Sequence, residues 1–182
     1  MKKILIAACV FALASCNSED KKEPEAKTAS TETGITMPYT ATYSGKFEMG
    51  DAKNSETIMK AWKSFDEGNL STCRSLFADS LDIYLREGGE MHGQTDSVMA
   101  GVQAYRNSMT SVKSTVHAYI SAKSIDKNEN WVTIWGTEVS TDKQGKVDSV
   151  GLVETWRLNK DGKINLLYQY GKALAPPMAM KK

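Results

Sequence analysis

Cysteine and histidine are both scarce in this chain, with three and two residues respectively among 182. Cys9 and Cys16 lie in an amino-terminal segment that we expect to be processed, so Cys73 remains as the one free thiol, which we expect to be buried. This leaves no partner for an intrachain disulfide and too few ligands for a transition-metal site. Phosphate-binding and dinucleotide-binding glycine patterns are missing as well, so we expect no metal and no cofactor.

An excess of charge of one sign is also lacking, since 23 Lys and Arg residues face 22 Asp and Glu residues. Proteins that bind nucleic acids need a basic face, so this balance excludes nucleic acid as a partner. Long hydrophobic runs are missing too. The apolar run at residues 4–14 is too short to cross a bilayer core of roughly 30 Å as a helix.

The amino terminus is typical of a bacterial lipoprotein signal. Lys2 and Lys3 precede the apolar run, which ends in Leu-Ala-Ser immediately before Cys16. Small residues before a cleavage site predict a signal peptide at residues 1–15. The pattern resembles a lipobox, the signal for lipidating the cysteine and cutting just before it. We therefore expect acyl chains on Cys16 to anchor the protein in the cell envelope, on an outer membrane and facing either the periplasm or the cell surface.

The remaining chain is predicted to be a tether followed by one domain. Residues 16–38 are rich in Glu, Lys, Ser and Thr without apolar periodicity, which predicts disorder after the lipidated cysteine. Residues 39–49 alternate aromatic and small polar residues and predict an extended arm that docks on the domain. Residues 50–172 have the usual size of one domain, and residues 173–182 predict a flexible tail.

Helical and strand periodicities are segregated along this domain. Ile58 and Trp62 lie at helical spacing, with Asn54 as the cap and Gly68 as the stop. A shorter helix follows, and a third is predicted over residues 95–112. Strands are predicted at residues 81–85, 116–125, 131–140, 148–159 and 163–170. Helices first and a meander afterwards indicate an α+β domain, in its simplest form a four-stranded antiparallel sheet with three helices on one face.

Several short motifs occur in order over residues 50–171. They are Gly68-Asn69-Leu70, Leu76-Phe77-Ala78-Asp79-Ser80-Leu81, His92-Gly93-Gln94, Val153-Glu154-Thr155-Trp156-Arg157-Leu158 and Asp161-Gly162-Lys163-Ile164. Together they resemble the nuclear transport factor 2-like superfamily. The resemblance implies a curved antiparallel sheet wrapped around three helices, a cystatin-like cone-shaped barrel with a pocket in its mouth. It also implies a homodimer that pairs through the sheet.

The superfamily includes SnoaL-like cyclases, ketosteroid isomerases, dehydratases and non-catalytic members, so the fold does not supply a function. The isomerase pattern needs a carboxylate base on the first strand, a tyrosine on the first helix and a protonated acid on a later strand. The matching positions hold Leu85, Ala61 and Glu154. Two of the three groups are absent, which excludes a ketosteroid isomerase.

Glu154 and His117 are the weak candidates for catalysis. On this alignment Glu154 points inward beside Trp156, where desolvation favours its neutral form. The alternative is a structural ion pair with Arg157, Arg106 or a lysine. His117 lies on a predicted strand and faces either the cone or a partner; SnoaL-like cyclases use a pocket histidine and an acid for proton transfer.

Aromatic residues dominate the predicted ligand site. The residues expected to line it are Trp62, Leu85, Tyr105, Trp135, Glu154 and Trp156. Core packing is the alternative for Trp62 and Trp156, and an outward Trp135 favours the dimer interface. The leading hypothesis is an anchored module that binds a small apolar ligand or a protein partner without catalysis. The alternative is a SnoaL-like isomerase, cyclase or dehydratase that uses Glu154 and His117 as acid and base.

Overall fold

The computed structural model describes residues 37–174. The chain divides into two units, Met1–Pro38 and Tyr39–Lys182, and every helix and strand described here belongs to the second. Cys16 and the segments expected to be signal peptide and tether lie outside the described residues, as does the tail beyond Leu174. No helix within residues 37–174 is long and apolar enough to cross a membrane.

Helix α1 (Ala52–Glu67) begins one turn earlier than predicted. Its cap is Asp51, whose side chain accepts a hydrogen bond from the backbone N–H of Lys53 at 2.8 Å. Asn54 instead lies inside the helix, buried, with its amide donating to Ser121 at 3.5 Å. The predicted stop is confirmed: Gly68 adopts a left-handed conformation with φ of 76°.

The second and third helices are both short. Residues Leu70–Leu76 form a 3₁₀ helix, η1, which contains the buried Cys73. Helix α2 (Thr95–Arg106) ends well before residue 112, because the chain from Met109 onward pairs as a strand. Arg106 is buried at this helix end, and its guanidinium donates to the carbonyl oxygens of Phe65 and Asp66 at the carboxyl end of α1.

The sheet has seven strands rather than the four of the simplest expectation. The strands are β1 (Phe47–Met49), β2 (Phe77–Tyr84), β3 (Glu90–Gln94), β4 (Met109–Ser124), β5 (Glu129–Asp142), β6 (Val147–Leu158) and β7 (Ile164–Ala173). Their order is β1-β4-β5-β6-β7-β2-β3, and only the pair β2–β7 is parallel. The motif around His92 lies in the edge strand β3.

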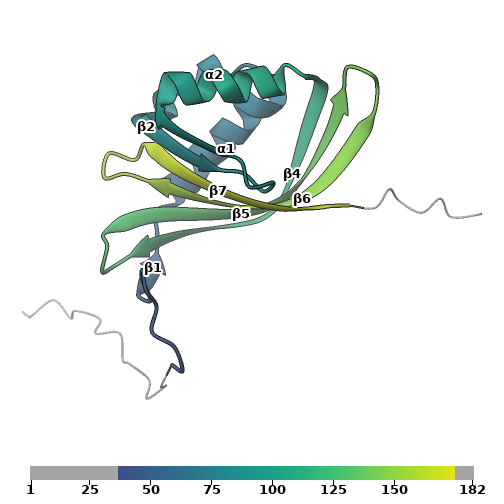
Figure 1. The fold of residues 1–182 in the computed structure, drawn as a ribbon. Helices are drawn as coiled ribbons and strands as arrows, with labels where there is room; N and C mark the ends of the chain where they lie inside the picture. Colours follow the sequence, from purple (N-terminus) through teal and green to yellow (C-terminus); the bar gives the residue numbers. More distant parts are fainter. Residues whose placement is uncertain (1–36, 175–182) are drawn as a thin grey trace, which may run out of the picture. The chain divides into compact units, whose positions relative to one another are not determined.

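The sheet curves around the helices (Figure 1). The core cluster combines side chains of the helices and of the strands that they cover. The largest fully buried side chains come from α1, β2, β5, β6 and β7, and they are Ile58, Leu81, Ile134, Leu158 and Ile164. Alternating residues of β5 and β6 are buried on the side that faces the helices, which is why the two-residue period was visible in the sequence. The prediction of an α+β domain with a curved sheet wrapped around three helices is confirmed.

The segment before α1 contacts the end of the β4–β5 hairpin. The ring of Tyr43 packs edge-on against Trp131 with centroids 6.1 Å apart, and its hydroxyl donates to Glu129. Ser44 donates to Asp126 at 2.5 Å, and β1 then pairs with β4. The chain therefore enters the domain at this hairpin.

The convex face of the sheet carries exposed apolar side chains. Ala118, Trp135, Val153 and Tyr170 are successive partners across β4, β5, β6 and β7, on the face opposite the core. Trp135 is 39% exposed and Tyr170 is 62% exposed. The homodimer expected through this face stays a prediction.

Gly136 permits a close approach of Trp62 on α1 to the sheet. A Cβ at this position would lie 2.8 Å from Cη2 of Trp62 and 2.7 Å from the carbonyl oxygen of Thr115. We expect Gly136→Ala to lower the free energy of unfolding by about 1–3 kcal/mol through overpacking, measured by urea denaturation. Gly45→Ala is the control, because its nearest neighbour would be 3.6 Å away. Equal effects of the two substitutions would contradict this account.

Candidate ligand pocket

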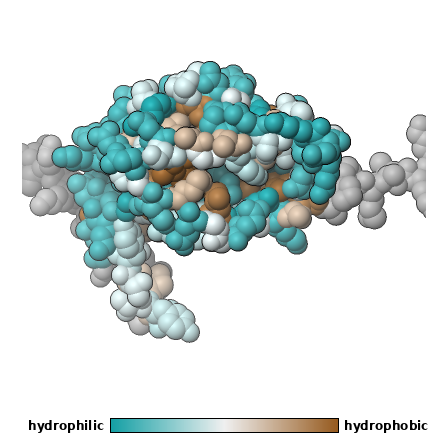
Figure 2. Space-filling model, turned by 45° about the horizontal axis from the view of Figure 1, so that its top comes forward, coloured by the Kyte–Doolittle hydropathy of each residue, from teal (hydrophilic) through white to brown (hydrophobic). Residues whose placement is uncertain are grey.

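A cavity of about 260 Å³ lies between the helices and the concave face of the sheet. Its lining is mostly apolar and comes from α1, η1, α2 and six of the strands, together with Leu85, Arg86 and Glu87 in the β2–β3 turn. Figure 2 shows hydrophobic side chains inside a hollow that hydrophilic residues surround. This is the usual composition of a small-molecule site.

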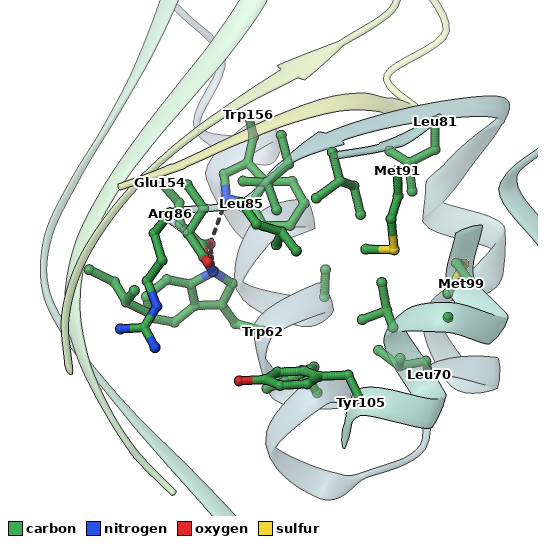
Figure 3. Close-up of a pocket in the computed structure, with 18 of the residues that line it drawn as sticks. Trp62, Leu70, Leu81, Leu85, Arg86, Met91, Met99, Tyr105, Glu154 and Trp156 are labelled. Atoms are coloured by element: carbon green, nitrogen blue, oxygen red, sulfur yellow. Dashed lines mark hydrogen bonds between the residues drawn. The ribbon is translucent and has the colours of Figure 1, made fainter. Parts of the chain in front are cut away.

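Strand and helix periodicity explain which side chains reach the cavity. Leu152, Glu154 and Trp156 alternate along β6 and share its concave face. Ala61 and Trp62 lie on the face of α1 that packs toward the sheet, and both are buried. Figure 3 shows the Trp62 and Trp156 indoles meeting at Glu154 at one end of the pocket.

Glu154 is buried, at 5% exposure, and its carboxyl oxygens are fully engaged. Its Oε2 accepts hydrogen bonds from the indole N–H groups of Trp62 at 2.6 Å and Trp156 at 3.1 Å. Its Oε1 accepts from the amide of Gln169 at 2.8 Å. Burial raises the pKa of Glu154, and the three donors oppose that rise.

The ion pairs considered for Glu154 do not form. Arg157 lies with its guanidinium 3.5 Å from Glu129, near the β4–β5 hairpin. Arg106 is committed to backbone carbonyl groups at the end of α1. Neutral N–H donors therefore take the place of a cation beside this acid.

Glu138 is a second acid of the pocket, and the sequence analysis missed it. It lies on β5, two residues beyond Gly136, on the same concave face. Burial, followed by the charge of Glu154, raises its pKa to about 7, while Arg86 lowers it less. Within residues 37–174 no group forms a hydrogen bond or ion pair with the carboxyl group of Glu138.

Five of the six predicted ligand-binding residues are brought together. Trp62, Leu85, Tyr105, Glu154 and Trp156 all line the cavity. The sixth, Trp135, does not, because residues of its parity on β5 face the convex side.

His117 lies on the opposite face of the sheet from Glu154. A β-bulge between Val116 and Ala118 breaks the alternation of β4, and Nε2 of His117 lies 2.8 Å from the hydroxyl of Thr137 on the convex side. Glu154 and His117 therefore do not form the acid–base pair of the enzyme hypothesis.

The other histidine, His92, is exposed on β3 between Asp82 at 3.1 Å and Glu90 at 3.0 Å. These hydrogen bonds raise its pKa. Among residues 37–174 no group of three or more His, Cys, Asp or Glu residues is arranged to hold a metal ion.

No protein-family model matches the sequence, and no curated protein matches it significantly. Solved structures do match. A nuclear transport factor 2-like protein of unknown function from Exiguobacterium sp. 255-15 is 21% identical with a TM-score of 0.54, and the match covers 64% of this chain and 98% of that one.

Two further matches carry functional descriptions. The epoxide hydrolase/cyclase-like enzyme SalBIII, described for its role in pyran ring formation in the polyether salinomycin, is 17% identical with a TM-score of 0.52, over 66% of this chain and 91% of that one. A Mycobacterium tuberculosis protein in complex with estradiol-17β-hemisuccinate is 16% identical with a TM-score of 0.54, over 66% and 94%. At these identities the likeness shows the fold alone.

The raised pKa of Glu138 makes stability depend on pH with a definite sign. Between pH 4.5 and about 7 the folded state holds more protons than the unfolded state, so the free energy of unfolding falls as pH rises. We expect the difference in melting temperature, Glu138→Gln minus the unaltered protein, to be more positive at pH 8 than at pH 5. Thermal unfolding at both values measures this.

The matched control is Glu56→Gln, at an exposed position where Lys60 lowers the pKa of the carboxyl. Its melting temperature relative to the unaltered protein should not be higher at pH 8 than at pH 5. If Glu138→Gln raised the melting temperature equally at both pH values, the stability would not depend on the ionisation of Glu138 as proposed.

Proposed function

Because the chain has the nuclear transport factor 2-like fold, we propose that its pocket binds a small, largely apolar ligand without transforming it. The observation that carries the proposal is the cavity of about 260 Å³, lined mainly by aliphatic and aromatic side chains. Only a few polar groups converge on it, among them Glu138, Glu154, Gln169 and Tyr105. Apolar walls supply affinity, and sparse polar groups fix orientation.

The solved structures support a ligand of this kind. The Mycobacterium tuberculosis protein holds estradiol-17β-hemisuccinate, which joins a rigid apolar ring system to a polar group. The apolar walls of this chain's pocket suit a rigid apolar ring system of this kind, whereas its two acids favour a different polar group from a carboxylate.

Glu138 favours a second candidate function, an isomerase, cyclase or dehydratase of the SnoaL-like type. A carboxyl group whose pKa is about 7 is suited to accept and return a proton. Glu138 and Glu154 would take the roles that the sequence analysis gave to Glu154 and His117. The two candidates differ in one outcome: an enzyme releases a ligand of altered structure, whereas a binding module returns it unchanged.

We also propose that acyl chains on Cys16 anchor this domain to a membrane of the cell envelope. The support is the signal pattern before Cys16 and the polar segment between it and Tyr39. In a bacterial host the unaltered protein should sediment with membranes, and Cys16→Ser should move it to the soluble fraction. Cys73→Ser, at the buried thiol, is the control and should stay with the membranes. Equal distributions of the two variants would contradict lipidation.

Ligand binding is tested by closing the cavity. Leu85 is partly buried at the pocket wall, so Leu85→Trp fills space that a ligand would use. We expect the compact unit Tyr39–Lys182 to bind the neutral fluorescent probe N-phenyl-1-naphthylamine saturably, and Leu85→Trp to weaken binding by about tenfold or more. Fluorescence titration measures both.

The control is Val147→Trp at the exposed start of β6, outside the pocket. It should bind the probe as the unaltered protein does. Binding that is unchanged in Leu85→Trp, or a signal that does not saturate, would contradict the proposed function.

A further inference from the structure

The two acids of the pocket differ in how their charge is compensated. Glu154 accepts three hydrogen bonds from Trp62, Trp156 and Gln169. Glu138 accepts none from the described residues, although it is partly buried in the pocket wall. A carboxylate that is partly desolvated without a donor is destabilised. Within residues 37–174, Glu138 is the one carboxyl group of the pocket lining without a hydrogen bond or ion pair, since Glu87 pairs with Arg86.

The charged groups around Glu138 are already committed elsewhere. On the β2–β3 turn, the guanidinium of Arg86 lies 2.7 Å from the carboxylate of Glu87. On α2, Arg106 donates to carbonyl oxygens of α1. On α1, Asp66 accepts from the backbone N–H of Ser114 on β4 at 3.0 Å and from its hydroxyl at 2.8 Å.

The balance of charge at the pocket is acidic. Its lining contains three carboxyl groups, Glu87, Glu138 and Glu154, against the single guanidinium of Arg86. Tyr105 is the remaining titratable group, and burial raises the pKa of its hydroxyl. Arg86 forms its ion pair with Glu87, and Glu154 accepts hydrogen bonds from neutral donors. Among the described residues, Glu138 therefore has no positively charged hydrogen-bond donor of its own.

We propose that the pocket selects an apolar molecule that carries a protonated amine, and that the ammonium group pairs with the carboxylate of Glu138. This inference rests on the proposed function. The hydrocarbon part lies against the apolar wall formed by residues such as Leu81, Met99 and Val102. The ammonium supplies both the donors and the charge that Glu138 does not receive from the protein.

The affinity for such an amine should depend on pH, because the pairing requires the ionised form of Glu138. With a pKa of about 7, Glu138 is mostly protonated at pH 6 and mostly ionised at pH 8. An alkylammonium stays charged over this range, so only the ionised form of Glu138 pairs with it. The affinity for the amine should therefore rise by about tenfold from pH 6 to pH 8, following the ionised fraction.

The test uses three compounds with one rigid apolar cage: 1-adamantanamine, 1-adamantanol and 1-adamantanecarboxylate. Isothermal titration of Tyr39–Lys182 at pH 6 and pH 8 measures their dissociation constants. The amine should bind most tightly and show the tenfold rise. The alcohol should bind more weakly with little dependence on pH, and the carboxylate should bind least at pH 8.

Glu138→Gln assigns the effect to this residue. The variant should bind the alcohol as before, which shows that its pocket is intact, and should bind the amine no better than the alcohol at either pH. The control is Glu67→Gln, at the exposed end of α1 where Glu67 pairs with Lys63 outside the pocket. It should keep the preference for the amine and its pH profile.

The outcomes separate the inference from the proposed function. If none of the three compounds binds, the proposed function fails and the inference falls with it. If the alcohol or the carboxylate binds as tightly as the amine, the pocket binds apolar ligands but the ligand class is wrong. A preference for the amine that persists in Glu138→Gln would equally overturn the role of Glu138.

Discussion

The packing of α1 against the sheet depends on the buried carboxyl group of Glu154. Its three donors come from different elements: Trp62 from α1, Trp156 from β6 itself and Gln169 from β7. A shift of the helix along the sheet would break the bond from Trp62 and leave both a buried indole N–H and a buried carboxyl oxygen without partners. The Trp62 indole also passes directly over Gly136. These two constraints fix α1 in position and close one end of the pocket.

The sequence predicted the elements whose patterns are local. The stop at Gly68 and the strands of the second half of the domain follow from a left-handed glycine and from alternation of apolar residues. It did not predict that residues 77–84 would lie parallel to β7, because that pairing joins segments about 80 residues apart. The end of α2 was misplaced because Met109 fits both a helical face and the start of β4.

The candidate site was predicted where helix spacing or strand parity was clear, as for Trp62, Glu154 and Trp156. It was not predictable at β5, where both faces carry apolar residues and the sequence does not show which face is buried. For this reason Trp135 was wrongly predicted to line the pocket, and Glu138 was not predicted to line it. The orientation of His117 stayed open in the sequence for another reason, since a β-bulge interrupts the alternation of β4 and no local signal marks the bulge.

The two acids of the pocket differ in position and in their hydrogen-bond partners. Glu154, at the closed end, accepts its hydrogen bonds from the protein and therefore needs no donor from a ligand. Glu138, on the wall, has a pKa of about 7 because burial and the charge of Glu154 outweigh the attraction of Arg86 and Arg106. A ligand without a donor would desolvate Glu138 further and favour the neutral carboxyl, whereas a cationic ligand would favour the carboxylate. The protonation state of Glu138 and the identity of the ligand are thus coupled, and this coupling gives an otherwise apolar pocket a means of selection.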